Sequence, residues 1–415
     1  MKLFFFKYFL EKTKLSLSVD NQVKIKLNGF FLKFFSKGKY LILEKKPISD
    51  YINYILIKKS EKIKLSLPKE SSKKLNLYYD TNNLELGFAV FDNALVSPDS
   101  NLVYYKNNCY YPKLVLESNN DEILFESDTI IKDTPNFIFL DNTKKGVFIE
   151  KAISFCGNWP TNWYHLMIEI MSKIALLEKL PIEFMNYPIL ISEEAYNKPN
   201  QNDLINSLLN GKDIIPISSS YLTSVKNLIY IDSPVMTPPN YRNNNINRFE
   251  KKLDYNINLY YYGNYRNFLL SKIINKTSDL KNVFLARKQE KRIYNQDEFF
   301  GCIEPYGFKK IYIENYSFFE QANIFKNADF IIGPTGAAWA NLIFSKPHQK
   351  GIILMPNFAK ESTVYSNLSY LSNVDLYHCF YDCLSKNWIE YMNSDEAIKI
   401  DVSDFLENYI QIVKP

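Results

Sequence analysis

The 415-residue chain is poor in several residue types that would point to particular classes of protein. It has five cysteines, an odd number without framework spacing, so a disulfide-stapled fold is not expected and reduced thiols are the default. No stretch reaches the roughly 18 apolar residues that a membrane-spanning helix needs. The opening MKLFFFKYFLEK is shorter than a span and precedes no small-residue cleavage site. We expect a cytoplasmic protein.

Groups of metal ligands are also scarce. The sequence contains no Asp-x-Asp, although oxygen-rich sites for divalent ions are built from carboxylates. His378, Cys379 and Cys383 lie close together, but they offer fewer ligands than a structural zinc site requires. The sequence therefore predicts no metal site and no bound cofactor.

Positive charge is unevenly distributed. Residues 1–79 hold 18 lysines and six acidic residues, a balance of +12, whereas the whole chain carries a net charge of +5. This basic region could attract the anionic inner face of the cytoplasmic membrane, giving peripheral contact. The alternative is a solvated lysine-rich face. We find no nucleic-acid-binding module, so nucleic acid is not an expected partner.

Hydrophobic periodicity divides the chain into three parts. Residues 1–150 contain short alternating runs and are predicted to be a β-rich N-terminal region. Residues 151–275 and 276–415 alternate between strand and helix patterns, which predicts two Rossmann-like lobes in an α/β protein. A final helix over 394–413 could return to pack on the first lobe. Ser49–Ile57 is predicted to be a short helix.

The segment Ala328–Phe344, ADFIIGPTGAAWANLIF, predicts a strand, a sharp turn and the start of a helix. Small residues let a ligand approach the backbone, and free N–H groups at a helix N-terminus favour an anion such as a diphosphate. The alternative is an ordinary packing turn. The predicted binding residues of this turn are Gly333, Thr335, Gly336 and Ala337.

Arginine is rare, with five residues against 45 lysines, so each arginine is more informative than a lysine. Arg287 ends a predicted strand and Arg292 follows in the next loop. Two guanidinium groups at a strand terminus suit a diphosphate, and surface charge is the alternative. Gln321 and Asn341 are predicted supporting contacts.

A third motif, GNWPTNWYHLMIE, spans Gly157–Glu169. Asn162, His165 and Glu169 stand at i, i+3 and i+7, so they share one face of a helix predicted over 161–179. A carboxylate one turn from an imidazole can orient it as a general base. Asn158 and Asn162 are expected on the acceptor side of such a site. The alternative is a surface hydrogen bond without a catalytic role.

The order of these motifs resembles a known family. The Asn162-x-x-His165 segment with Glu169 is followed by the Arg287 and Arg292 block, then by SFFEQANIF, then by GPTGAAWANLIF. Together they resemble the catalytic domain of glycosyltransferase family 61, especially the bacterial members near capsular polysaccharide genes. The similarity covers about residues 150–360. It implies a GT-B fold, a nucleotide-sugar donor and inversion at the anomeric carbon without an obligatory metal.

Residues and resemblance together predict an inverting, metal-independent glycosyltransferase that builds capsule or lipopolysaccharide. His165 and Glu169 would be catalytic, the arginines and the glycine turn would hold a nucleotide-sugar, with a UDP-sugar favoured, and the acceptor would be a glycan or lipid-linked glycan. The alternatives are a pyruvyl-type transferase on a similar fold and an inactive, membrane-docked scaffold of a glycan assembly complex.

Overall fold

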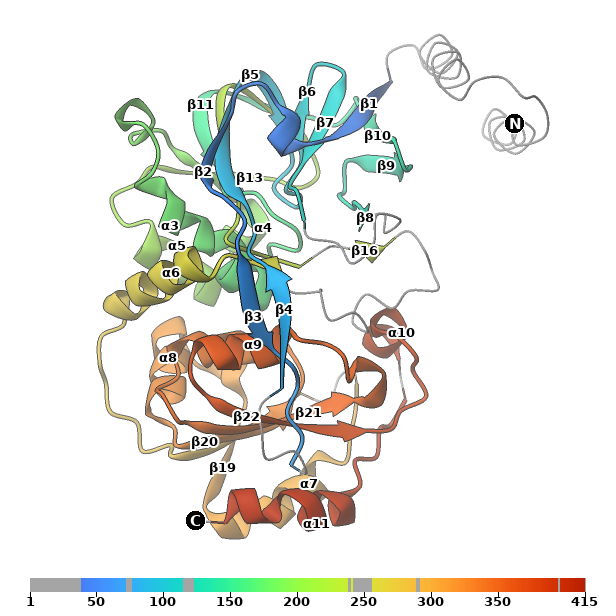
Figure 1. The fold of residues 1–415 in the computed structure, drawn as a ribbon, viewed down its shortest axis with the longest axis vertical. Coiled ribbons are helices and arrows are strands. Elements are labelled where there is room, and N and C mark those ends of the chain that lie inside the picture. The colour runs from blue at the N-terminus through green and yellow to red at the C-terminus, as the bar shows by residue number, and fades with distance from the viewer. Residues whose placement is uncertain are drawn as a thin grey trace, which may run out of the picture.

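The computed structural model describes residues 39–71, 77–114, 123–237, 240–241, 256–288, 292–394 and 396–414. The predicted membrane contact rests on the basic region 1–79, of which residues 1–38 and 72–76 lie outside the described part. Figure 1 shows two bodies, one built on a large mixed sheet and the other on a smaller parallel sheet. The protein is therefore a mixed α/β structure with a β-rich N-terminal region, as predicted.

Eleven described strands form the large sheet, in the order β13-β12-β11-β14-β5-β6-β7-β1-β10-β9, with β2 also paired to β5. They are β1 (Tyr40–Pro47), β2 (Tyr54–Lys58), β5 (Leu86–Val96), β6 (Val103–Tyr105), β7 (Asn108–Tyr111), β9 (Ile130–Asp133), β10 (Phe137–Asp141), β11 (Lys145–Ser154), β12 (Ile189–Ser192), β13 (Ile214–Ile217) and β14 (Leu222–Ile231).

The three central strands of this sheet, β5, β11 and β14, bend sharply together. The amide of Gly157, just past β11, donates to the carbonyl of Pro98, just past β5 (3.1 Å). The pairing places the end of β11 beside Tyr230, at one end of β14, and the end of β5 beside Thr223, at the other end. If the ten residues of β14 were straight, these two points would be about 30 Å apart, too far for this hydrogen bond. The bend passes Asn93, where φ is +60°. The sheet therefore curves back on itself, and an apolar core that includes Phe91 packs inside the curve.

Beyond the bend, β13, β12, β11 and β14 are parallel. Taking β11 as the first strand, their spatial order is 3-2-1-4, so the order reverses between β11 and β14. Open parallel sheets bind ligands at the carboxyl ends of strands at such a reversal. The chain leaving β11 there leads directly into the segment that carries His165. β11 also crosses the predicted boundary between residues 150 and 151, so one sheet joins the two predicted regions.

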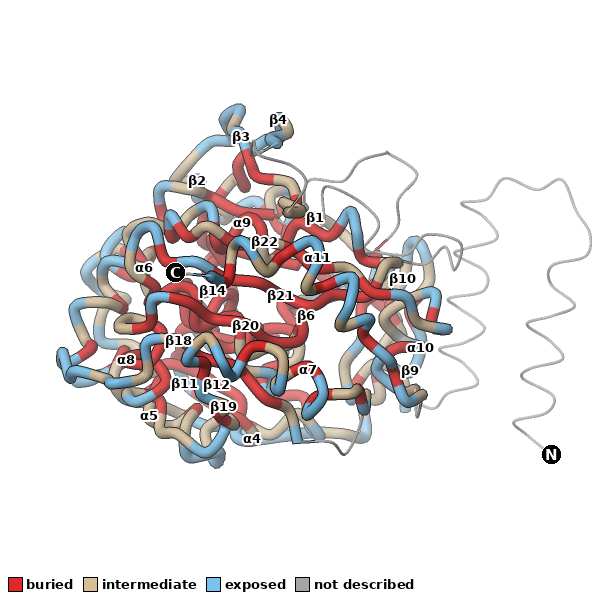
Figure 2. Tube along the Cα trace, turned by 90° about the horizontal axis from the view of Figure 1, so that it is seen from below, coloured by how far each residue is buried: buried red, intermediate tan, exposed pale blue. Residues whose placement is uncertain are grey.

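The second large sheet has five parallel strands in the order β19-β18-β20-β21-β22. They are β18 (Asn282–Leu285), β19 (Phe308–Ile311), β20 (Phe330–Pro334), β21 (Lys350–Pro356) and β22 (Asp375–Tyr381). Alternate residues face opposite cores: Ile331 packs in one and Ile332 in the other. Figure 2 shows these strands buried along much of their length. Burial on both faces is typical of a parallel sheet covered by helices.

The short sheets pair β3 (Lys62–Ser66) with β4 (Tyr78–Asn82), β15 (Val235–Met236) with β17 (Asn256–Ile257), and β8 (Ile123–Leu124) with β16 (Asn240–Tyr241). The β3–β4 hairpin extends from the upper body to the lower one (Figure 1). There the Ser66 amide donates to Asn367 Oδ1 (2.7 Å), and the Lys69 amide donates to His378 Nδ1 (3.3 Å).

The α-helices are α3 (Ile174–Leu177), α4 (Glu193–Tyr196), α5 (Pro199–Leu208), α6 (Leu259–Lys272), α7 (Gln296–Ile303), α8 (Phe318–Asn327), α9 (Val364–Leu371), α10 (Trp388–Asn393) and α11 (Val402–Val413). The 3₁₀ helices are η1 (Ile48–Asp50), η3 (Met171–Lys173), η4 (Ile182–Phe184), η6 (Glu304–Tyr306), η7 (Ile313–Asn315), η8 (Ala337–Phe344) and η9 (Asn357–Ala359), and η2 (His165–Ile170) is a π-helix.

One apolar core joins the two bodies, because it contains Met167 and Leu204 from the first and Phe318 and Ile331 from the second. The long helix α6 runs between them. Its Arg266 donates to the carbonyls of Ile343 (2.9 Å) and Ser345 (2.8 Å), at the end of η8. A cation at a helix C-terminus is electrostatically favourable. The bodies are therefore joined by packing and by directed hydrogen bonds.

Two predictions near the chain ends are wrong. Ser49–Ile57 is not a helix, because it divides between η1 and β2. The final helix begins at Val402 instead of 394, since the Asp401 side chain accepts from the amides of Ser403 and Asp404 and caps it there. That helix packs through Phe405 against Phe299 of α7 (ring centroids 4.6 Å apart). It therefore covers the five-stranded sheet and does not return to the first body.

Candidate functional site

The predicted arginines and glycine turn meet at the strand reversal of the five-stranded sheet. Taking β18 as the first strand, the order is 2-1-3-4-5, and it reverses between β18 and β20. Arg287 follows β18, and Gly336 follows β20. Gly333 permits this approach, because a Cβ there would lie 2.7 Å from Leu285 Cβ and 3.0 Å from its carbonyl oxygen. Any larger residue would push the two strands apart.

Arg287 lies across the turn after β20. Its backbone amide donates to Gln296 Oε1 (2.7 Å), and its Nη2 donates to the Thr335 carbonyl. A Cβ on Gly336 would lie 3.2 Å from the same Nη2. The glycine therefore leaves room for the guanidinium group, which brings a fixed positive charge to the start of η8.

Arg292 brings a second cation to the same place. Its backbone has φ +53°, and its guanidinium carbon lies 5.7 Å from the centre of the Tyr391 ring. Its buried Nε has no hydrogen-bond partner among the described residues. Burial lowers the pKa of Arg292, and the positive charge of Arg287 lowers it further. Two neighbouring positive charges and an unused buried donor form a site that an anion would stabilise.

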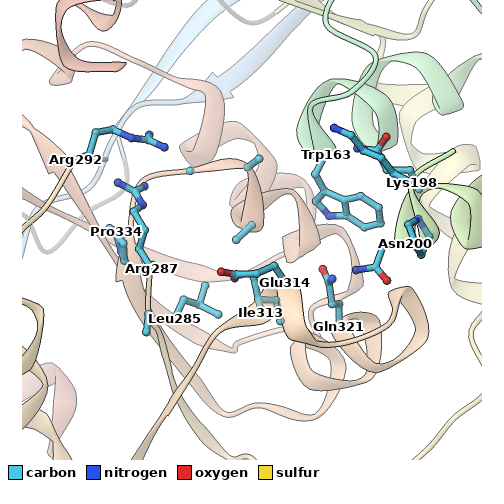
Figure 3. A pocket seen from close by; sticks show the side chains of 16 residues that line it. Trp163, Lys198, Asn200, Leu285, Arg287, Arg292, Ile313, Glu314, Gln321 and Pro334 are labelled. Carbon is cyan, nitrogen blue, oxygen red and sulfur yellow. The ribbon is translucent and has the colours of Figure 1, made fainter. Parts of the chain in front are cut away.

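These groups line a cavity of about 590 Å³ between the two bodies. Figure 3 shows Arg287 and Arg292 at one end of it and Trp163, Lys198 and Asn200 at the other, with Glu314 and Gln321 between them. The full lining is Trp163, Lys198, Pro199, Asn200, Gln201, Leu285, Ala286, Arg287, Arg292, Ile313, Glu314, Gln321, Pro334, Gly336, Ala337 and Ala338.

Three of the predicted donor-side residues do not line this cavity. Gly333 and Thr335 lie behind its wall, where Gly333 sets the strand spacing and Thr335 offers its carbonyl to Arg287. Asn341 is fully buried: its Oδ1 accepts from Trp163 Nε1 (3.3 Å) and its Nδ2 donates to Gln321 Oε1 (3.2 Å). Its amide therefore joins the two bodies and positions the cavity wall.

The His165–Glu169 pair lies in the other body, on the π-helix η2. His165 Nδ1 is 3.0 Å from Glu169 Oε2, and the two residues are 9% and 3% exposed. The other carboxylate oxygen, Oε1, accepts from the amide of Thr237 (3.0 Å) and from its hydroxyl. A carboxylate only accepts hydrogen bonds, so in the neutral imidazole Nδ1 carries the proton and Nε2 keeps a lone pair. His165 Nε2 is therefore a candidate proton acceptor, and Glu169 orients the ring through Nδ1.

His165 lines a second, smaller cavity of about 110 Å³. Its wall includes His165 and Asn162 from the first body and Tyr365, Trp388 and Ala337 from the second. Ala337 also lines the arginine cavity. The cavity at the imidazole and the cavity at the arginines therefore share one wall residue, Ala337.

Asn158 lies elsewhere. It lines a third cavity of about 370 Å³, together with Trp159, whose ring centroid is 4.8 Å from that of His165. Of the two residues predicted on the acceptor side, Asn162 therefore adjoins the imidazole, and Asn158 lies beyond Trp159.

Several lining residues were missed in the sequence. Trp163 is an apolar residue of the helix predicted over 161–179, and its sequence did not distinguish a core position from one at the cavity wall. Thr237, Tyr365 and Trp388 stand in loops or at helix starts with no motif around them, and only the folded chain brings them to His165. Thr237 donates to the Glu169 carboxylate from 68 residues away, and a contact over that separation leaves no pattern in the sequence.

No group of three or more His, Cys, Asp or Glu side chains among the described residues could hold a metal ion. None of the helices in this part of the chain combines the length and hydropathy needed to cross a membrane.

An anion site facing a proton acceptor is the arrangement of an enzyme that transfers a group from an anionic leaving group. Residues 163–353 match the family model described as Glycosyltransferase 61. The match contains His165, both arginines and the turn after β20. Over these residues the chain is similar to the glycosyltransferase 61 family. No curated protein matches it significantly.

Proposed function

We propose that the protein is an inverting, metal-independent glycosyltransferase that moves a sugar from a nucleotide-sugar, with a UDP-sugar as the favoured donor. Its two parallel sheets would then serve as the two Rossmann-like lobes of a GT-B enzyme. The observation that supports the proposal is that Ala337 lines both the cavity at the two arginines and the cavity at His165.

In this proposal the diphosphate lies at the arginine end of the larger cavity. Arg287 and Arg292 would neutralise it, and the amides at the start of η8 would donate to it. As the bond to the anomeric carbon breaks, negative charge grows on the leaving oxygen, and fixed cations stabilise that charge most. Arginines would thereby replace the divalent ion that many sugar-nucleotide enzymes use.

The acceptor hydroxyl would lie at His165 Nε2, in the small cavity. As its oxygen attacks the anomeric carbon, its proton passes to Nε2, and the sugar–phosphate bond breaks on the opposite face. Displacement from the opposite face inverts the configuration. Glu169 would hold the ring and stabilise the imidazolium that forms, because its own oxygens stay engaged by Thr237 and Nδ1.

We further propose a cell-surface glycan of a bacterium, capsule or lipopolysaccharide, as the product, and the cytoplasm as the location. A lipid-linked acceptor would bring the enzyme to the inner face of the membrane, where the lysine-rich N-terminal region would add electrostatic attraction. The support for this part is the sequence resemblance and the charge distribution.

The test is a thermal-shift and turnover screen of the full chain against UDP-, GDP-, CMP- and TDP-sugars. A ligand at 100 times its dissociation constant stabilises the folded protein by about 2.7 kcal/mol, which such a screen resolves. One nucleotide series should stabilise the protein and be slowly hydrolysed, with loss of both effects in Arg287→Ala. Stabilisation by none of them, or by phosphoenolpyruvate instead, would contradict the proposal.

A further inference from the structure

Gly336 lies in the turn after β20, and the orientation of its backbone decides what this turn offers to an anion. Because glycine has no Cβ, the peptide groups on either side of it rotate at little steric cost. Such a rotation would turn a carbonyl oxygen toward the arginine cavity in place of an amide hydrogen. A carbonyl oxygen repels a diphosphate, so an anion site at this turn requires contacts that fix the backbone.

Two side chains hold the carbonyl groups of this turn. Arg287 Nη2 donates to the Thr335 carbonyl. The hydroxyl of Tyr365 donates to the next carbonyl, that of Gly336 (3.1 Å). The Trp339 amide also donates to the Gly336 carbonyl (3.1 Å), and an oxygen with two lone pairs can accept both hydrogen bonds. The turn is therefore held by one cation and one neutral hydroxyl.

The place of Tyr365 is itself well fixed. Tyr365 is the second residue of α9, which is tied to β3 through its next two residues. The Ser366 hydroxyl donates to the Ser66 carbonyl (2.8 Å), and Asn367 Oδ1 accepts from the Ser66 amide (2.7 Å). The Tyr365 ring also meets the Tyr164 ring edge-on, with centroids 6.4 Å apart. Contacts from the first body therefore constrain the ring that reaches the turn.

The Tyr365 hydroxyl is a donor at neutral pH. Burial raises its pKa, and the nearby positive charges of Arg292 and Arg287 offset only part of that rise. Tyr365 also lines the small cavity at His165. One side chain thus holds the turn beside the arginines and forms part of the wall that faces the candidate base.

We propose that Tyr365 is a positioning residue of the diphosphate site, which holds the Gly336 carbonyl so that the Ala337 amide stays available to the diphosphate. The inference rests on the proposed function. This carbonyl and this amide belong to one trans peptide group and point in opposite directions, so fixing the first fixes the second. Ala337 lines the arginine cavity, and its amide precedes the first hydrogen bond of η8, so no helical carbonyl competes for it.

The fixed amide would act on bond breaking as well as on binding. As the acceptor oxygen bonds to the anomeric carbon, the electron pair of the sugar–phosphate bond stays on the phosphate oxygen. A donor that is already oriented stabilises this charge without reorganisation. The acceptor proton passes to His165, and Tyr365 keeps its own proton throughout.

The experiment titrates the full chain with inorganic pyrophosphate and with UDP by isothermal titration calorimetry, in EDTA and at fixed ionic strength. Pyrophosphate has neither base nor sugar, so it reports on the diphosphate site whichever nucleotide the enzyme uses. Tyr365→Phe removes one oxygen and keeps the ring. It should weaken the binding of both probes about two- to tenfold, the effect of one neutral hydrogen bond.

Tyr370→Phe is the matched control. Tyr370 lies on the same helix, is 40% exposed and lines none of the cavities found in the described part of the chain, so this variant should bind pyrophosphate as wild type does. Arg287→Ala should weaken pyrophosphate binding more than Tyr365→Phe, because it removes a charge-assisted contact.

Thermal unfolding without ligand separates positioning from stability. A purely structural role of Tyr365 would lower the unfolding temperature and the titration stoichiometry, and the folded fraction would keep wild-type affinity.

The outcomes distinguish this inference from the proposed function. If Arg287→Ala weakens pyrophosphate binding and Tyr365→Phe keeps wild-type affinity, the inference is wrong and the proposed function stands. Equal weakening in Tyr365→Phe and Tyr370→Phe would overturn it as well, because the effect would not belong to the hydroxyl at the turn. If neither pyrophosphate nor UDP binds to wild type, the diphosphate site fails and the proposed function fails with it.

Discussion

The indole Nε1 of Trp163 donates to Oδ1 of Asn341 at 3.3 Å, across 178 residues of chain. Trp163 lies two residues before His165, and Asn341 lies on η8, the helix that follows the turn after β20. The same Asn341 donates from Nδ2 to Gln321 Oε1 (3.2 Å), and Gln321 Nε2 donates to the Tyr316 carbonyl (2.9 Å). One buried amide therefore sets the distance between the candidate base and the candidate anion site.

Asn341→Ala should lower the free energy of unfolding by about 1–3 kcal/mol, because it leaves two polar groups without their partner. Urea unfolding of the variant and wild type measures this difference. Asn210→Ala, at an exposed position, is the control and should stay within about 0.5 kcal/mol of wild type. Equal stability of all three proteins would show that the amide network does not hold the bodies together.

Arg287→Ala and Arg292→Ala should each weaken nucleotide-sugar affinity by about 1.5–3 kcal/mol, the range for a charge-assisted hydrogen bond. Isothermal titration with the best nucleotide of the screen measures the loss. The matched control is Lys309→Ala, because Lys309 is an exposed cation on β19 that does not line the cavity. Unchanged nucleotide-sugar affinity in both arginine variants would contradict the assignment of Arg287 and Arg292 to the donor site.

The predictable part of the site was local. Residues 330–338 carry the strand, the proline and the small residues in sequence, so the turn after β20 could be expected without any tertiary contact. The spacing of His165 and Glu169 likewise lies within one helical turn. The alternation of strand and helix patterns over 276–390 predicted most of the five-stranded sheet, because each strand there is short and carries buried apolar residues.

What escaped prediction depends on contacts distant in sequence. The bend in β5, β11 and β14 depends on how the three strands pack together. The alternating pattern of each segment predicts a strand, but it does not predict that the paired strands curve. Asn341 has the same neighbours in sequence whether it binds a ligand or Trp163. The start of α11 was the exception: the Asp401 cap was visible in the sequence and outweighs the preceding apolar pattern.

Chelation should leave activity intact. No group of three or more possible metal ligands exists in the described residues, and Arg287 and Arg292 line the cavity that we propose for the diphosphate, where they would neutralise its charge. Turnover of the identified nucleotide-sugar is measured after treatment with excess EDTA and gel filtration. Loss of turnover that manganese or magnesium restores would contradict the proposed metal independence.

Acid should destabilise the protein through His378. This residue is fully buried, its Nδ1 accepts from the Lys69 amide, and burial lowers its pKa to about 3. Between pH 6.5 and about 3 the unfolded chain therefore binds a proton that the folded chain lacks, so stability is full above pH 6.5 and falls with pH. The slope is about 1.4 kcal/mol per pH unit for one proton.

The measurement compares urea unfolding at pH 6.5 and pH 5 for wild type and His378→Gln. Wild type should lose about 2 kcal/mol more than the variant over this interval, from the linkage slope of one proton. His348→Gln, at an exposed position, should keep the wild-type difference. Equal losses in wild type and His378→Gln would mean that other groups carry the acid sensitivity.

His165→Ala should lower turnover at least about 100-fold with little change in nucleotide-sugar affinity, because general-base catalysis contributes 10²–10⁴-fold, order of magnitude. Steady-state kcat and titrated affinity measure the two effects separately. A fall in affinity with unchanged kcat would place His165 in donor binding.

Glu169→Gln should lower turnover less, by about 10- to 100-fold. The Thr237 amide needs an acceptor at Oε1, so the new NH₂ group would face His165 Nδ1 and donate to it. The imidazole would then carry its proton on Nε2 and could not accept the acceptor's proton until the ring changed tautomer. If Glu169→Gln abolishes turnover and His165→Ala leaves it nearly intact, Glu169 is the base. If neither variant changes turnover, the proton leaves by another group and η2 only supports the fold.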